Sequence, residues 1–456
     1  MTVLIEGFAP DAIALARLLV QEGRAVRIAS ATAANESATA LRELGIHVEP
    51  AADLDADPGP AEIAYLDVWT PEVAPRVQRL RAQGTRISCL GDLLLERWDG
   101  PSIGITGTAG KTTTTSLVAH VLRTAGIDVA VSQGARADNL WPTADLLHGL
   151  QAERSPGAGA PILLLELTSS HLAFMCSSPT IAAVISFWPD HLELHGDLPR
   201  YRRAKETIVR HQRAGDLAIL CADDASAGFA ASTPADVAEI SLRRPVERGA
   251  FLDPERGVVL VDSKGETVLG PIHRSAAHPG NVVAAAAIAA AAGAGFASIE
   301  RGASTATPPR WRAQPAGTLM GNRVVDDGMA ATPLKAAATL AAYPDHSVVL
   351  IAGGLNDAGG GPVHATPEER VLLERACDEI ARVARAVVVF GEAGPRLAAL
   401  LRGRGVEPIE TTDLEAAVAA AARRCSPGVA SVVFSPLFPV MLDDRARFAA
   451  LVGRSP

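Results

Sequence analysis

The residues best suited to chemistry lie in the run "GITGTAGKTTTTSLVAHVL", from Gly104 to Leu122. A β-like stretch precedes its glycines and an amphipathic stretch follows them, so the run predicts a strand, a turn and a helix whose first N–H groups face an anion. Lys111 can then reach the β- and γ-phosphates of a nucleotide, and Thr112 offers the hydroxyl that Mg²⁺ needs. Because the first glycines do not keep the usual P-loop spacing, a glycine turn with a chance Gly-Lys-Thr is the alternative.

Four polar side chains further along the chain are candidates for the chemistry. Glu166 ends the apolar run "PILLLEL", and a carboxylate buried there needs a metal or hydrogen bonds. His191 and His195 are four residues apart, as in many zinc sites, but no third ligand follows at zinc-like spacing. Solvated or capping histidines are the simpler interpretation. Lys205, taken alone, reads as a solvated helix lysine.

The elements that must position these residues alternate between apolar runs and helical stretches, which indicates an α/β protein. We expect three domains: an N-terminal Rossmann-like domain at residues 1–97, a central P-loop ATPase domain with a parallel sheet at 98–300, and a C-terminal Rossmann-like domain at 301–456. The central runs "SIGITG", "PILLLEL" and "IAAVISF" are typical of strands covered on both faces.

Composition excludes several functional classes. The 456 residues are 48% hydrophobic and carry a net charge of −9, which argues against nucleic acid as a partner. No run is long and apolar enough to span a membrane, and the N-terminus lacks the charged start of a signal peptide. The five cysteines are scattered and form no CxxC pair, so we expect reduced thiols in a cytoplasmic protein. We also expect a monomer.

Several segments together resemble the Mur ligase family. The phosphate loop "TGTAGKT" is similar to the family's Thr-Gly-Thr-x-Gly-Lys-Ser/Thr, with Ala109 where asparagine is common. The blocks "LLLELTSSHLAF" and "SFWPDHLELHGDLPRYRRAKETIV" follow in the family's order. The resemblance spans nearly the whole chain and is strong in the central domain. It implies an ATP- and Mg²⁺-dependent ligase that joins a carboxylate donor, in the family a UDP-linked muramoyl peptide, to an amino acid or amine.

The resemblance also implies roles for individual residues. The nucleotide would be held by Gly107, Thr108, Ala109, Gly110, Lys111, Thr112, Thr113, Asn281, Arg310 and Asp327. Two Mg²⁺ ions would be held by Thr112, Glu166, His191 and Lys205, with Lys205 carbamylated. The residues expected to carry the chemistry are Lys111, Lys205, His191 and Glu166. Those expected at the substrates are Thr168, His171, Asp357 and Val440.

The substrate pockets depart from the family's pattern. The first turn, "EGFAPDA", keeps Gly7 alone, and "VWTPEV" replaces the family's Ser-Pro-Gly-Ile. In the branch that adds glutamate, two lysines and a serine hold the amino acid; here Met329, Asp357 and Val440 stand in those places. We therefore expect an altered amino acid or donor. A register shift in "GGLNDAGGG", with Lys335 reaching the pocket, is the alternative.

The sequence thus favours a carboxylate–amine ligase acting through an acyl phosphate. A genuine UDP-N-acetylmuramoyl-L-alanine–D-glutamate ligase of peptidoglycan synthesis is one alternative. A descendant that binds nucleotide, or hydrolyses ATP without forming an amide, is the other. Because the phosphate and metal residues are all kept while the pockets diverge, the ligase is preferred.

Overall fold

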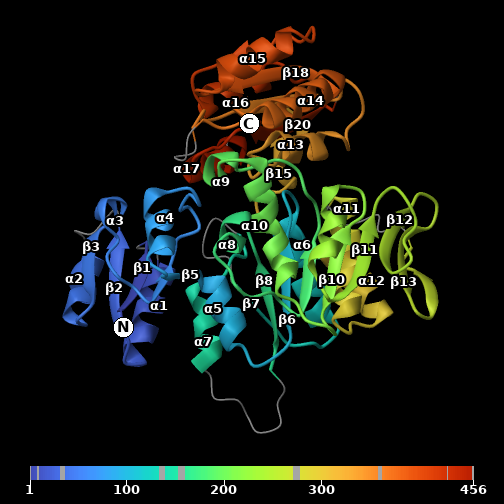
Figure 1. Ribbon diagram of the computed structural model, residues 1–456. Helices are drawn as coiled ribbons and strands as arrows, with labels where there is room; N and C mark the ends of the chain where they lie inside the picture. Colours follow the sequence, from blue (N-terminus) through green and yellow to red (C-terminus); the bar gives the residue numbers. More distant parts are fainter. Residues whose placement is uncertain are drawn as a thin grey trace. The chain divides into compact units, whose positions relative to one another are not determined.

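The computed structural model describes residues 2–7, 10–30, 36–132, 139–151, 160–270, 278–357, 362–428 and 430–453. They form two compact units: Met1–His273 with Pro279–Ala306, and Arg274–His278 with Thr307–Pro456. Three sheets with their helices give the expected α/β architecture of three domains (Figure 1). The boundaries at residues 97 and 300 stay predictions.

The first sheet of the first unit is parallel, in the order β3-β2-β1-β4-β5. Its apolar strands are buried, as covered parallel strands must be. The strands are β1 (Thr2–Glu6), β2 (Ala25–Ser30), β3 (His47–Pro50), β4 (Ile63–Tyr65) and β5 (Arg86–Ser88). The helices are α1 (Pro10–Gln21), α2 (Glu36–Glu43), α3 (Ala51–Ala56), α4 (Pro75–Ala82) and α5 (Leu90–Arg97).

The second sheet has nine strands in the order β14-β13-β12-β11-β10-β9-β6-β8-β7, parallel from β7 to β12. Its strands are β6 (Ser102–Thr106), β7 (Val129–Val131), β8 (Ile162–Glu166), β9 (Ile181–Val184), β10 (Leu217–Cys221), β11 (Asp236–Ser241), β12 (Gly249–Asp253), β13 (Gly257–Asp262) and β14 (Gly265–Val268). Its helices are α6 (Lys111–Thr124), α7 (Ala144–Gln151), α8 (Ser169–Leu172), α9 (Leu192–His195), α10 (Leu198–Arg210), the 3₁₀ helix η1 (Ala225–Ser232), α11 (Pro279–Ala291) and α12 (Phe296–Thr305). The central strands β6, β8 and β9 end beside one another, where a doubly wound sheet binds its ligand.

The second unit contains a six-stranded sheet in the order β15-β16-β20-β17-β18-β19, with β15 antiparallel. Its strands are β15 (Gln314–Leu319), β16 (Asn322–Asp326), β17 (Val348–Gly353), β18 (Ala384–Phe390), β19 (Ile409–Glu410) and β20 (Ser431–Leu437). Its helices are α13 (Pro333–Leu340), α14 (Pro367–Val383), α15 (Gly394–Arg402), α16 (Leu414–Ala422) and α17 (Leu442–Gly453). Two apolar clusters, one on each face of the sheet, form its core.

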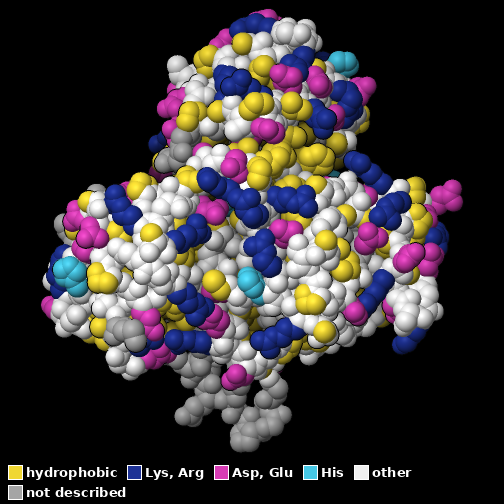
Figure 2. Space-filling model, in the orientation of Figure 1, with side chains coloured by type: hydrophobic (Ala, Val, Ile, Leu, Met, Phe, Trp, Pro, Cys, Tyr) yellow, Lys and Arg dark blue, Asp and Glu magenta, His cyan; other side chains and the backbone are white. Residues whose placement is uncertain are grey.

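The charged surface residues and the cysteines are arranged as the composition leads one to expect. On the face seen in Figure 2, basic and acidic side chains are intermingled rather than gathered by sign. All five cysteines are free thiols, as expected. Among the described residues, no helix has the length and apolar character to cross a membrane.

Candidate active site

The phosphate loop connects β6 to α6, so the predicted strand, turn and helix are confirmed. Gly110 precedes α6 with φ +83, in the left-handed region that favours glycine. A Cβ at Gly110 would lie 2.2 Å from Oδ1 of Asn281, at the start of α11. Thr114, in the first turns of α6, donates to the same oxygen at 3.4 Å. The structure thus brings Asn281 to the phosphate loop, although the two are far apart in the sequence.

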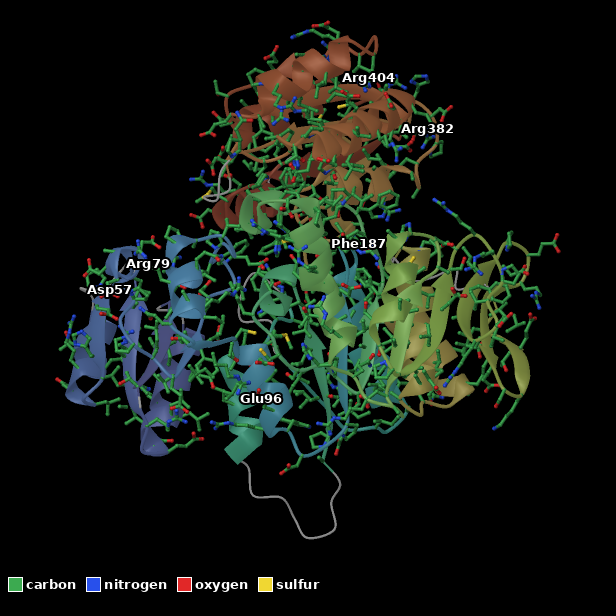
Figure 3. The ribbon with its side chains drawn as sticks, viewed as in Figure 1. Asp57, Arg79, Glu96, Phe187, Arg382 and Arg404 are labelled. Carbon is green, nitrogen blue, oxygen red and sulfur yellow. The ribbon has the colours of Figure 1, made fainter. Side chains whose placement is uncertain are left out.

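Neighbouring segments fix the loop by hydrogen bonds. The hydroxyl of Thr108 donates to the carbonyl of Trp188 at 2.9 Å and lies 2.8 Å from the hydroxyl of Tyr201 on α10. The N–H of Ala109 donates to Oγ of Ser186 at 3.0 Å. Phe187, labelled in Figure 3, packs against the ring of Tyr201 with centroids 5.5 Å apart. The loop therefore holds its shape through contacts outside itself.

Lys111 lies across the loop. Its ammonium donates to the carbonyl of Gly107 at 2.8 Å and of Thr108 at 3.4 Å. These two carbonyls belong to the backbone of the loop, so the side chain is held near the position a phosphate would take. Thr112 and Thr113 follow in the first turn of α6, where the helix N-terminus favours negative charge.

Thr112 and Glu166 form the centre of the site. The Thr112 hydroxyl donates to Oε1 of Glu166 at 2.9 Å, and the Glu166 side chain, at the end of β8, is 1% exposed. Trp141 donates its Nε1 to the same oxygen at 3.2 Å, and the N–H of Leu140 donates to Oε2 at 2.9 Å. A hydroxyl and a carboxylate in contact at a helix N-terminus suit Mg²⁺, which prefers oxygen ligands and completes its shell with phosphates and water. The pair therefore fits one Mg²⁺ ion.

Lys205 is buried beside the same loop rather than solvated. It is 1% exposed and donates to Oγ1 of Thr106 at 3.1 Å and to the carbonyl of Gly107 at 3.1 Å. Its ammonium lies 5.3 Å from the centre of the Tyr201 ring. A cation buried this deeply is unusual unless it has a task or a fixed set of partners.

The two histidines differ in environment. His191 precedes α9 with φ 54, its side chain is 39% exposed, and it contacts the carboxylates of Asp190 and Glu193. His195 is 1% exposed, and its Nδ1 lies 3.2 Å from Glu72 of the first sheet's domain. The described residues contain no cluster of three His, Cys, Asp or Glu that could hold a metal ion. The zinc alternative gains no support, and a second Mg²⁺ would need ligands beyond these side chains.

Thr168 and His171 form the cap of α8. The Thr168 side chain accepts from the N–H of His171 at 3.2 Å, and Nδ1 of His171 accepts from the N–H of Thr168 at 3.2 Å. The imidazole is therefore held in a fixed orientation by Thr168. Its ring meets Trp141 edge-on at 6.1 Å, and Trp141 meets Trp69 at 5.8 Å. Trp69 is 57% exposed. An exposed aromatic ring therefore lies next to Trp141, which donates to Glu166.

The remaining predicted residues belong to the second unit. Arg310 is exposed, and its guanidinium lies 4.9 Å above the Trp311 ring. Asp327 is 5% exposed, accepts from the N–H of Ala313 at 3.1 Å and from the Ser435 hydroxyl at 3.2 Å, and burial raises its pKa to about 7. These bonds hold Asp327 inside its own domain.

The two predicted amine-pocket residues lie in different environments. Asp357 is exposed and forms a bridge with Pro362. Val440 is buried in an apolar cluster. The glycines on which a register shift would depend, at 358–361, lie outside the described residues, and Lys335 on α13 is half-buried.

Comparison with known proteins places this site in a family. Residues 105–273 match the Mur ligase middle domain. The UDP-N-acetylmuramoylalanine–D-glutamate ligase of Symbiobacterium thermophilum is 30% identical over 450 residues, covering 95% of this chain and 92% of that protein. The ligase of the same name from Frankia casuarinae is 33% identical over 447 residues, covering 94% of this chain and 88% of that protein.

Two solved structures share the fold. The UDP-N-acetylmuramate-alanine ligase MurC of Thermotoga maritima aligns over 100% of both chains with a TM-score of 0.59 and 21% identity. The MurF ligase of Thermotoga maritima, in complex with ADP, aligns over 100% of this chain and 95% of that one, with a TM-score of 0.59 and 15% identity.

The fold and the phosphate loop with its carboxylate define an ATP-dependent ligase that forms amide bonds. The chain belongs to the Mur ligase family and is MurD-like.

Several residues at the site could not be singled out from the sequence. Tyr201 is fully buried, and burial raises its pKa well above the usual value, so it acts as a neutral hydroxyl against the loop. Ser186 lies in the run "IAAVISF", which predicts only a strand, and Trp141 lies in a segment without a regular pattern, so the sequence indicates neither the contact with the loop nor the contact with Glu166. The one available signal was the rarity of aromatic residues, 4% of the chain, of which two tryptophans and a tyrosine gather here.

Proposed function

We propose that this protein is a MurD-like ligase whose donor or amino acid differs from those of the glutamate-adding relatives. ATP phosphorylates the carboxylate of a donor acid, and the amine of an acceptor attacks the acyl phosphate and releases phosphate. The contact between Thr112 and Glu166 at the phosphate loop supports the ATP-dependent step of this proposal, because this pair and Lys111 are what phosphoryl transfer requires.

The loop residues would bind the nucleotide phosphates through their N–H groups, and Lys111 would leave the Gly107 carbonyl for the β- and γ-phosphates. Asn281 would contact adenine beside the loop. Arg310 and Asp327, in the second unit, are proposed nucleotide contacts, although Asp327 would first have to exchange its internal bonds. Thr112 and Glu166 would hold Mg²⁺, which supplies positive charge for the transferring phosphoryl group.

We propose a second Mg²⁺ near His191 and a carbamylated Lys205. The described lysine donates to two oxygens of the loop, and a carbamate would reverse this pattern because it offers oxygens rather than N–H donors. The Thr106 hydroxyl already donates to the carbonyl of Leu167 at 2.6 Å, and the carbonyl of Gly107 can only accept. Carbamylation therefore requires the Lys205 side chain to turn away from Gly107.

The first sheet supports a donor without a pyrophosphate. Glu6 ends β1, where a Rossmann-like domain normally receives phosphates, and it is 8% exposed. Thr70 donates to it at 2.7 Å and Arg76 binds it at 2.7 Å, so the guanidinium at this edge already has a carboxylate partner. At Gly7, a Cβ would lie 2.9 Å from Oδ2 of Asp67, and the Gly7 N–H already donates to the carbonyl of Ala29. Two carboxylates thus line the turn that a UDP group would need.

The D-glutamate ligase remains the second candidate, since that is the name of both relatives. A matrix of donors and amino acids separates the two. With UDP-N-acetylmuramoyl-L-alanine and saturating ATP, D-glutamate should release phosphate poorly, whereas a neutral or basic amino acid with a donor lacking UDP should release it well. Efficient, saturable use of the UDP donor with D-glutamate, with other pairs inactive, would identify the protein as a D-glutamate ligase.

We propose that the protein acts as a monomer in the cytoplasm, with peptidoglycan synthesis as the setting. Gel filtration at micromolar concentration would check the monomer.

A further inference from the structure

Trp141 connects the proposed metal carboxylate to two further aromatic rings. Its ring meets the imidazole of His171 edge-on, with centroids 6.1 Å apart, and the ring of Trp69 edge-on, with centroids 5.8 Å apart. The chain has only five tryptophans in 456 residues, so a contact between two of them is not what the composition leads one to expect. The proposed mechanism assigns no task to the faces of these rings.

The ring of Trp141 is fixed relative to Glu166. Its Nε1 donates to Oε1 of Glu166 at 3.2 Å, and the N–H of Leu140, the preceding residue, donates to Oε2 at 2.9 Å. Glu166 is 1% exposed, so both bonds are shielded from water and are strengthened by it. A ring held in this way presents its faces at a defined place, one hydrogen bond from the carboxylate that would hold Mg²⁺.

Trp69 adds an exposed ring at the ligand edge of the first sheet. It follows the carboxyl end of β4, which pairs with β1 in the interior of this parallel sheet. Its N–H donates to Oδ1 of Asp67 at 3.0 Å, and the N–H of Thr70 donates to the carbonyl of Asp67 at 3.0 Å, so a turn fixes its backbone. The side chain is 57% exposed, whereas the other four tryptophans are buried or half-buried. A ligand that covers so large an apolar ring releases the water around it, and this release favours binding.

The charges at this edge favour an uncharged group rather than a phosphate. The carboxylate of Glu6 ends β1, and that of Asp67 lies in the turn after β4. Arg76, the cation beside them, is paired with Glu6 and with Asp55. A phosphate would meet the two carboxylates at close range, whereas an uncharged ring would not be repelled.

The order of the rings matches the path of a donor. The carboxylate of the donor must reach the γ-phosphate beside Thr112 and Glu166 to be phosphorylated. Trp141 is one hydrogen bond from Glu166, and Trp69 is one ring contact further. The part of the donor that adjoins its carboxylate would therefore lie against these rings.

We propose that Trp69 and Trp141 form a subsite for a flat aromatic group of the donor, close to the carboxylate that is phosphorylated. The inference rests on the proposed ligase function and names its donor class: a carboxylic acid that carries an aromatic ring near the carboxylate. A tryptophan ring binds such a group by offset or edge-to-face contact, which adds to the gain from covering both apolar surfaces. The uracil of a UDP-linked donor does not meet this description, because a diphosphate and a sugar separate it from the reacting carboxylate.

The test compares aryl acids with acids of the same size that lack a flat ring. The probes are phenylacetic acid, 3-phenylpropanoic acid and N-benzoyl-L-alanine, each paired with the acid in which cyclohexane replaces the benzene ring. Binding to the full chain is measured by titration calorimetry in the presence of Mg²⁺ and a non-hydrolysable ATP analogue. The variants are Trp69→Ala and Trp69→Phe. The matched control is Phe296→Ala, which removes another exposed ring from the same unit, at the start of α12.

Wild type and Phe296→Ala should bind at least one aryl acid ~5-fold more tightly than its cyclohexyl partner, the gain expected from an aromatic pair beyond its buried area. Trp69→Phe should keep most of this preference and Trp69→Ala should lose it, while the affinity for the ATP analogue stays the same in all four proteins. Absence of saturable binding by every aryl acid, equal binding within every pair, or a preference that persists in Trp69→Ala would overturn the inference. A weaker affinity of Trp69→Ala for the ATP analogue would assign the ring to adenine, and Trp69-dependent binding of uridine monophosphate would assign it to uracil; either result also overturns the inference.

Donor activation is measured separately, with hydroxylamine as the acceptor. Its nitrogen attacks the carbonyl carbon of the acyl phosphate, the bond from that carbon to the phosphate oxygen breaks, and a hydroxamate and phosphate are released. The aryl acid that binds best should yield hydroxamate only with ATP, and its kcat/KM should fall ~5-fold in Trp69→Ala and stay unchanged in Phe296→Ala. Hydroxamate formed from UDP-N-acetylmuramoyl-L-alanine and from no aryl acid would overturn the inference and leave the ligase function standing. If no acid yields hydroxamate, the proposed function fails, and the calorimetry alone decides the inference.

Discussion

Replacing Glu166 by glutamine should lower the free energy of unfolding, because glutamine cannot accept all the hydrogen bonds that the carboxylate accepts. The carboxylate accepts from three donors: the Thr112 hydroxyl and Trp141 Nε1 at one oxygen, and the Leu140 N–H at the other. A glutamine has one oxygen and one NH₂ group. Whichever way the amide is placed, its NH₂ group faces an N–H donor, from Trp141 or from Leu140. The Thr112 hydroxyl can rotate and accept, but an N–H cannot.

One donor therefore loses its acceptor in Glu166→Gln. Leaving a buried donor unpaired costs about 1–3 kcal/mol, so the free energy of unfolding of the first unit should fall by that amount. Trp141→Phe removes one of the competing donors. In the double variant, the amide NH₂ can face the rotated Thr112 hydroxyl while its oxygen accepts from Leu140. The double variant should thus recover most of the loss caused by Glu166→Gln.

Urea unfolding of the four proteins gives the coupling as a double-mutant cycle, which we expect to be about 1–2 kcal/mol in favour of the double variant. Ligase turnover should fall at least ~100-fold in both Glu166→Gln proteins, because the metal carboxylate is gone in each. The double variant would then regain stability but not activity. If Glu166→Gln costs the same stability in the Trp141→Phe background as in the wild type, the described arrangement of donors is refuted.

Three further predictions concern the loop, the buried lysine and the second unit. Lys111→Ala should abolish ATP-dependent turnover and change the free energy of unfolding by less than ~1 kcal/mol, because the hydrogen bonds described for it end on loop carbonyls; calorimetry checks the fold, and turnover at the wild-type rate would contradict the P-loop assignment. Lys205→Ala should lose activity, and added formate should restore part of it by standing in for a carbamate; a nucleotide-bound crystal structure with an unmodified Lys205 far from any metal would count against this. Asp327→Asn should flatten the pH dependence of stability, because the raised pKa of about 7 keeps a proton on the folded protein that the unfolded chain loses near pH ~4, so wild-type stability falls as the pH rises through this window. Urea titrations at pH 4.5, 6 and 8 measure it, and equal slopes for the two proteins would refute it.

Local patterns allowed the phosphate loop to be predicted. The strand, the glycines and the Lys-Thr pair are adjacent in sequence, and Gly110 occupies a backbone conformation that a side chain would disfavour. The buried carboxylate was also predictable, because Glu166 ends an uninterrupted apolar run. The proximity of Asn281 to the loop depended on family resemblance, since no local pattern relates α11 to α6.

Other features depend on tertiary structure and had no local signal. The sequence around Lys205 is typical of a surface lysine, yet its side chain points from α10 toward the end of β6, where it is buried and donates to Thr106. Arg445 on α17 is buried and Arg447, two residues further along the same helix, is exposed, and the sequence does not distinguish the two. Trp141 bonds Glu166 across 25 positions from a stretch without periodicity. The sequence therefore predicted the ATP chemistry better than the substrate pockets.

The central claim, that ATP activates a donor carboxylate, is tested most directly by oxygen transfer. The donor that supports turnover is prepared with ¹⁸O in its carboxylate, and the phosphate released in the presence of the acceptor is analysed by mass spectrometry. One ¹⁸O atom per phosphate is predicted, because the carboxylate oxygen that attacks ATP leaves with the phosphate when the amine attacks. Released phosphate without label, formed with or without the acceptor, would mean that water attacks ATP directly and would contradict the ligase account.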